Sequence, residues 1–260
     1  MIGAVISFGC TLVGLFAGFL FALIGMGPGM IIVSSLHLMC GYDLKKAATG
    51  SLFLLIPVSI SSVTAHFYYS NTFSPSIPWI LCGSLIGVDL GLFLRRKLSP
   101  RTLRILFTIF LTLVIFRHFS NLLEISIPLA TFDFNFDWYH HMITGCLAST
   151  LSASMGIGGG VLIMTTYFGV LGFPVKEVAV TSACVVSLNT SLSSFKSRKI
   201  LYWDSNLSLI LSFGLVGAFL GGLTSSRVSE EALRWLVGGF LVVVLLNMVR
   251  GLLKDQKVRE

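Results

Sequence analysis

Long stretches without a charged side chain constrain this sequence more than any other feature. No Asp, Glu, Lys or Arg occurs in residues 1–42, 47–88, 138–175 or 205–226. Each stretch exceeds the roughly 20 residues that cross a hydrocarbon core as a helix. The stretches are apolar on every face, unlike the alternating strands of a membrane barrel. We therefore expect an all-α integral membrane protein embedded in the lipid bilayer.

The composition argues against soluble functions. Hydrophobic residues make up 55% of the 260 residues and charged residues 11%, whereas soluble domains carry about 25% charged residues. The net charge of +7 is expected to set membrane topology, and no nucleic acid is expected as a partner. No room is left for a soluble catalytic module, and no acid–base or metal-binding constellation is evident. We expect neither an enzyme nor a cofactor.

The sequence contains a duplicated unit of about 130 residues. Residues 24–29 (Ile-Gly-Met-Gly-Pro-Gly) match residues 155–160 (Met-Gly-Ile-Gly-Gly-Gly) at an offset of 131, and 8 of the 27 positions from 25 to 51 are identical at that offset. A second matching block, 87–104, continues at an offset of 130. These matches predict three parts, which are a first transmembrane repeat at 1–120, an external linker at 121–137 and a second transmembrane repeat at 138–260.

The basic residues indicate how often the chain crosses. If the short segments 28–41 and 159–172 cross, each repeat has five spans, and 14 of the 18 Lys and Arg residues share one side. If both segments instead enter the membrane and leave on the same side, each repeat has four spans and the 18 basic residues divide 10 to 8 between the two sides. Because basic residues concentrate on the cytoplasmic side, five spans are favoured. Each short segment measures only about 21 Å as a helix, so the expected range is 8–10 spans.

An odd number of spans inverts the second repeat relative to the first. Inverted repeats are typical of secondary transporters, in which they allow alternating access. The topology predicts a multi-pass protein of the cytoplasmic (inner) membrane with both termini cytoplasmic. A chain of 28.3 kDa with faces of small residues could act as a monomer or as a homodimer.

The glycine motifs resemble a known family. The run Gly156-Ile157-Gly158-Gly159-Gly160, followed by Lys176 and Ala179-Val180-Thr181-Ser182, is similar to the TauE/SafE family of sulfite and organosulfonate exporters. The first repeat carries the related runs 25–29 and 48–51. The resemblance implies transport of small sulfur-containing anions, usually outward. Pro28 departs from the family's third glycine and lacks an N–H donor, which puts an equal role of the two repeats in doubt.

The glycine runs are also the predicted site of the small anionic substrate. Backbone that leaves a helix within the membrane must line a cavity or be buried in protein, and free N–H groups at the next helix start can bind an anion. Alternatively, the glycines only permit close helix packing, and the hydroxyls nearby only bond to helices. The candidate substrate-binding residues are Gly25, Gly27, Gly29, Ser51, Gly156, Gly158, Gly159, Gly160, Ser182, Asn189 and Thr190.

Asp89 stands alone inside a predicted span and is the candidate proton-coupling residue. An ionisable group at such a position is costly and is often functional, and burial would raise its pKa. Alternatively, the carboxylate bonds to a neighbouring helix or lies near Arg95.

Secondary transport of small anions, sulfite or an organosulfur anion, is the favoured function, with export the expected direction. An anion channel is the first alternative. A membrane redox conduit is the second, but it requires a reactive cysteine pair. The five cysteines lie one per apolar stretch, without a C-x-x-C pair. They are expected to act as small buried hydrophobes.

Overall fold

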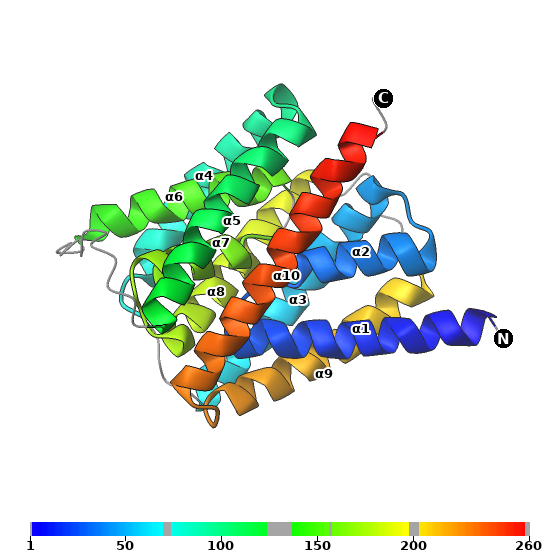
Figure 1. Ribbon diagram of the computed structural model, residues 1–260. Helices are drawn as coiled ribbons and strands as arrows, with labels where there is room; N and C mark the ends of the chain where they lie inside the picture. Colours follow the sequence, from blue (N-terminus) through cyan, green and yellow to red (C-terminus); the bar gives the residue numbers. More distant parts are fainter. Residues whose placement is uncertain (1, 70–73, 124–136, 156–157, 198–202, 258–260) are drawn as a thin grey trace.

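The computed structural model describes residues 2–69, 74–123, 137–155, 158–197 and 203–257. Within these ranges the chain forms ten α-helices and one π-helix, and no strand is present (Figure 1). The first repeat contains α1 (Ile2–Ile24), α2 (Gly29–Cys40), α3 (Leu44–Tyr69), α4 (Ile77–Lys97) and α5 (Pro100–Leu122). The second contains α6 (Trp138–Met155), α7 (Gly160–Met164), the π-helix η1 (Thr165–Val170), α8 (Val175–Ser197), α9 (Ser205–Ser225) and α10 (Glu230–Lys257).

Helix length and composition confirm the expected all-helical membrane architecture. Seven of the described helices are long and apolar enough to cross a bilayer: α1, α3, α4, α5, α8, α9 and α10. The short apolar helices are α2 and the continuous pair α7 and η1, and they follow the glycine runs as expected. Crossing of the membrane by these short segments stays a prediction.

The outer faces of the helices are apolar. Phe8, Leu113 and Phe195 lie on three different helices, and each side chain is at least 65% exposed. A large exposed apolar surface would promote aggregation in water, whereas a bilayer solvates it. The chain is thus a multi-pass membrane protein.

The first helix of each repeat forms a hairpin with the short helix that follows it. Cys10 of α1 contacts Cys40 of α2, and His141 of α6 contacts Tyr167 of η1. Both hairpins end at a glycine with positive φ, Gly41 at 70° and its equivalent Gly172 at 76°. Glycine adopts this region without a steric penalty, so it commonly ends helices. The duplication in sequence is therefore matched by equivalent local structure.

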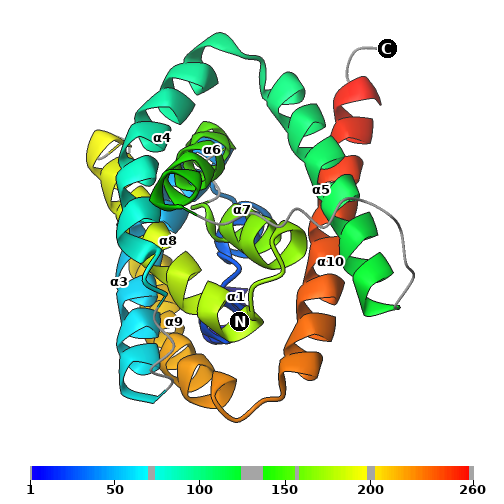
Figure 2. The same ribbon diagram turned by 90° about the vertical axis from the view of Figure 1, so that its left-hand side faces the viewer.

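The two repeats interlock. The most extensive packing joins α1 to α9 and α4 to α6. These two contacts are equivalent, because α1 corresponds to α6 and α4 corresponds to α9 in the two repeats. Glycines bring these helices together, since a Cβ on Gly18 would lie 2.9 Å from the carbonyl carbon of Gly214. Helices α3 and α8 pack together, as do α5 and α10. Figure 2 shows α5 and α10 side by side and running in opposite directions. The boundaries proposed for the repeats and the linker stay predictions.

Candidate functional site

The two glycine breaks, 25–28 and 158–159, meet inside the protein. Gly160 at the start of α7 lies against the first break, where an added Cβ would be 2.8 Å from the carbonyl oxygen of Gly25 and 3.0 Å from the Cα of Gly27. Gly25 has a φ of 69°, and a Cβ there would lie 2.5 Å from the Cα of Ala179. Only hydrogen fits at these positions. Segments more than 130 residues apart in sequence are thus in direct backbone contact.

Two equivalent serines stabilise the breaks. Ser51 on α3 donates to the carbonyl oxygen of Gly29, and Ser182 on α8 donates to that of Gly160, each at 3.3 Å. The Ser182 hydroxyl also lies 2.5 Å from the carbonyl oxygen of Gly25, so it joins both repeats. Both serines are fully buried. Both serines lie beside the breaks and their hydroxyl groups donate to backbone oxygens, so their role as substrate ligands stays a prediction.

A small polar niche surrounds Gly159. This glycine has a φ of 96°, and a Cβ there would lie 2.9 Å from Ser152 Oγ and 3.0 Å from Asn189 Nδ2. The same Nδ2 donates to Ser149 Oγ at 2.9 Å. Asn189 is 2% exposed, and its buried Oδ1 has no hydrogen-bond partner among the described residues. A buried polar group without a partner costs about 1–3 kcal/mol. A ligand that donates a hydrogen bond to this oxygen would remove that cost.

Ser149 and Ser152 were not among the predicted site residues. They lie on α6, in the run Ser149-Thr150-Leu151-Ser152-Ala153-Ser154 that ends one residue before the end of the helix. The signal was therefore present in the sequence as hydroxyl groups concentrated at the C-terminal end of this helix.

Thr190 presents its methyl group, not its hydroxyl group, to the second break. The Thr190 Cγ2 atom lies 3.4 Å from the position of a Cβ on Gly158, whose φ is 84°. The hydroxyl donates to the carbonyl oxygen of Val186 on its own helix at 2.7 Å. This is the structural role that the sequence left open for hydroxyls of this helix. Gly156, the remaining predicted residue, lies outside the described residues.

The two breaks differ in conformation. Pro28 has a φ of −75°, whereas its equivalent Gly159 has a φ of 96°. Proline is restricted to φ near −65°, so it could not occupy the second position. This difference agrees with the expectation that Pro28 makes the repeats unequal.

Burial of Asp89, one of the two alternatives for this residue, is not observed. Its side chain is 67% exposed and forms an ion pair with Lys196 on α8. Helix α4 buries its opposite face, which carries Gly83, Gly87 and Gly91. The pairing agrees with the alternative of a carboxylate bonded to a neighbouring helix. A role in proton coupling stays a prediction that can no longer rest on burial.

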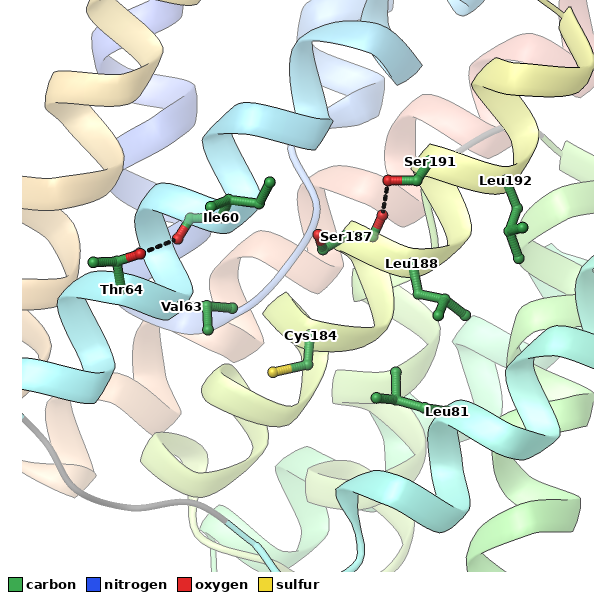
Figure 3. A pocket seen from close by; sticks show the side chains of 9 residues that line it. All are labelled: Ile60, Val63, Thr64, Leu81, Cys184, Ser187, Leu188, Ser191 and Leu192. Atoms are coloured by element: carbon green, nitrogen blue, oxygen red, sulfur yellow. Dashed lines mark hydrogen bonds between the residues drawn. The ribbon is translucent and has the colours of Figure 1, made fainter.

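An open groove of about 460 Å³ lies elsewhere, between α3, α4 and α8 (Figure 3). The Thr64 and Ser191 hydroxyls donate to carbonyl oxygens of their own helices at 2.8 and 2.7 Å. The groove wall is therefore mainly apolar. Its lining residues are Ile60, Val63, Thr64, Leu81, Cys184, Ser187, Leu188, Ser191 and Leu192. This lining contains no described residue of either break and does not include Asn189.

Polar contacts link the helix ends. Tyr42 after α2 donates to Asp204, which also accepts from the backbone N–H of Leu207 at 3.0 Å and so caps α9. Burial, and then the bond to this carboxylate, raises the pKa of Tyr42. Across the part of the chain that the structure describes, no three His, Cys, Asp or Glu side chains are grouped to hold a metal ion.

Comparison with known proteins identifies the family. The model of the sulfite exporter TauE/SafE family matches residues 4–118 and 141–260. The chain belongs to the TauE/SafE family. This family is one of membrane transporters, which agrees with the expectation that the chain is not an enzyme.

Curated relatives of this TauE/SafE protein carry transporter names. A "Probable membrane transporter protein" of Haemophilus influenzae is 26% identical over 92% of this chain and 96% of its own length. The "Probable membrane transporter protein YunE" of Bacillus subtilis is 23% identical over 85% of this chain and 88% of its own. A probable membrane transporter protein of Methanocaldococcus jannaschii is 30% identical over 42% of this chain and 43% of its own. No solved structure matches the chain.

Proposed function

We propose that this TauE/SafE transporter is a secondary carrier that exports sulfite or a small organosulfur anion across the cytoplasmic membrane. The observation that carries the proposal is the contact between the two breaks beside the niche of Asn189, Ser149 and Ser152. The name of the matching family, sulfite exporter, supports sulfite as the substrate and export as the direction of transport. Substrate sites of secondary transporters are typically formed where transmembrane helices are interrupted. The region around the two breaks combines such interruptions with buried polar side chains.

Neutral groups hold the anion in this proposal. The Asn189 amide can supply N–H donors, and the serine hydroxyls and free N–H groups next to the breaks can supply others. Their lack of net charge lowers the cost of releasing the anion on the other side. A buried Arg or Lys would instead pay a desolvation cost whenever the site is empty.

Movement between the repeats would expose the site alternately to each side. Two observations support inverted repeats. The contacts of α1 with α9 and of α4 with α6 are equivalent in the two repeats, and the equivalent helices α5 and α10 run in opposite directions (Figure 2). Because Gly160 touches Gly25 and Gly27, a small displacement of one break opens or closes the space between them. This geometry fits alternating access.

Contacts between helix ends support five spans per repeat with cytoplasmic termini. Tyr42 and Asp204 lie together, and both are assigned to the cytoplasmic side in this arrangement. At the other end of the molecule, Lys176 donates to the carbonyl oxygen of Ser226 at 3.2 Å, and both are assigned to the outside. The rule that basic residues concentrate inside gives the orientation.

Counterflow in liposomes tests the proposal. Purified protein is reconstituted with unlabelled anion inside, and uptake of a trace of ³⁵S-labelled sulfite, a two-carbon sulfonate or thiosulfate is followed. A carrier gives saturable, transient accumulation of label above its external concentration. A channel gives flux without accumulation, and absence of flux for every anion of the panel contradicts the proposal.

A further inference from the structure

Two cysteines of the first hairpin are in contact. The Sγ atoms of Cys10 on α1 and Cys40 on α2 are 3.5 Å apart, although 30 residues separate them in sequence. Both are free thiols, and Cys10 is buried whereas Cys40 is partly exposed. A disulfide has an S–S length of about 2.05 Å, so closing it requires the two sulfur atoms to approach by about 1.5 Å. The three other cysteines are free, and none makes a thiol–thiol contact within the described residues.

We propose that Cys10 and Cys40 are a reversible oxidation site at which a peroxide forms a disulfide between α1 and α2. The peroxide oxidises the partly exposed Cys40 thiol to a sulfenic acid and releases one water. The Cys10 thiol then attacks this sulfur, the S–S bond forms, and a second water leaves. The two thiols lose two electrons in total, which reduce one peroxide to two waters. A dithiol reductant restores both thiols.

The position of the pair gives the oxidation a functional consequence. The two cysteines lie at the open end of the α1–α2 hairpin, and the first break, at Gly25, lies at its closed end. A disulfide would fix α2 to α1 and restrict movement of the break between them. Transport would then slow, a consequence that rests on the proposed function.

Only the first repeat carries this site. The residues equivalent to Cys10 and Cys40 are His141 and Leu171, and the second hairpin is joined by His141 and the Tyr167 hydroxyl at 3.0 Å. Oxidation would therefore restrain one repeat and leave the other free. Because Gly25 of this hairpin lies against Gly160 of the second repeat, a restraint on the hairpin also restrains movement at the contact between the repeats.

Thiol counting tests the chemistry without any transport assay. Purified protein is treated with hydrogen peroxide, the peroxide is removed, and the denatured protein is alkylated with N-ethylmaleimide. The reactive thiols should fall from the five of the sequence to three, with a cross-linked peptide containing Cys10 and Cys40, and dithiothreitol should restore all five. Five reactive thiols after treatment, or a cross-link between other cysteines, would overturn the proposal.

Flux measurements test the consequence. A sulfonate is the labelled anion here, because sulfite cleaves disulfides. We expect peroxide to lower the counterflow rate of the wild type about tenfold, reversibly, and to leave Cys10→Ser and Cys40→Ser unaffected. Cys82→Ser, which removes an exposed cysteine, should stay sensitive. Equal sensitivity of wild type and Cys40→Ser would refute the inhibitory role. Absence of flux in reduced protein would count against the carrier function, whereas thiol counting would still report on the oxidation site.

Discussion

Replacing Gly160 with alanine tests the contact between the two breaks. The added methyl carbon would lie 2.8 Å from the Gly25 carbonyl oxygen and closer still to the Gly27 nitrogen. Ordinary van der Waals contact begins at 3.4 Å. The contact with the Gly25 oxygen alone requires the breaks to separate by about 0.6 Å, and the shorter contact with the Gly27 nitrogen requires more. Backbone atoms cannot rotate away as a flexible side chain can. Overpacking of this kind costs about 1–3 kcal/mol, and it falls on the proposed binding region.

Counterflow and thermal unfolding of the same preparations distinguish loss of function from loss of folding. Gly239→Ala is the neutral control, because nothing lies within 4 Å of its added Cβ. Gly145→Ala is the packing control, since its Cβ would lie 3.0 Å from the Ile80 carbonyl carbon, away from the breaks. We expect Gly160→Ala to lose counterflow at least tenfold while its melting temperature falls no more than that of Gly145→Ala. Wild-type counterflow by Gly160→Ala would refute the steric argument.

Three further predictions concern single side chains. Asn189→Leu keeps the shape of the side chain but removes its polar atoms. It should therefore abolish counterflow. Its melting temperature should change little, because loss of the bond from Nδ2 to Ser149 Oγ is offset by removal of the unpartnered buried oxygen. Wild-type flux would exclude Asn189 from the site. Asp89→Asn breaks an exposed ion pair with Lys196 and should change the free energy of unfolding by less than about 1 kcal/mol. If the flux of this variant responds to an imposed pH gradient as the wild type does, Asp89 has no role in proton coupling. Burial and the bond to Asp204 raise the pKa of Tyr42 above the usual 10, so its stabilisation is complete below pH 10 and is lost as pH rises through the raised value. The melting temperature of the wild type should fall across this alkaline range, and that of Tyr42→Phe should fall less.

The glycine motifs predicted the helix breaks but not what they touch. The offset of 131 relates Ser51 to Ser182, and the structure shows both bonded to equivalent carbonyl oxygens. The offset shows which residues of the two repeats are equivalent, but it does not show which residues touch. The bond from Ser182 to Gly25, for example, joins residues 157 positions apart. Such contacts depend on how two repeats pack, and a single sequence does not specify this.

Two features could have been found from helix geometry. Gly83, Gly87 and Gly91 recur every four residues and so share one face of α4, the face that packs on α6. Asp89 lies two residues from Gly87, on the opposite face, which accounts for its exposure. Similarly, Cys10 and Cys40 are each 15 residues from Gly25. A hairpin folded at that glycine brings them to the same level.

Equilibrium binding tests most directly whether an anion binds where the breaks meet. Binding of ³⁵S-labelled sulfite to detergent-purified protein is measured by scintillation proximity for the wild type, Gly160→Ala, Asn189→Leu and Gly239→Ala. We expect saturable binding to the wild type and Gly239→Ala, and at least tenfold weaker binding to the other two, equivalent to about 1.4 kcal/mol. Equal affinity of all four proteins for sulfite would place the anion elsewhere and contradict the proposed site.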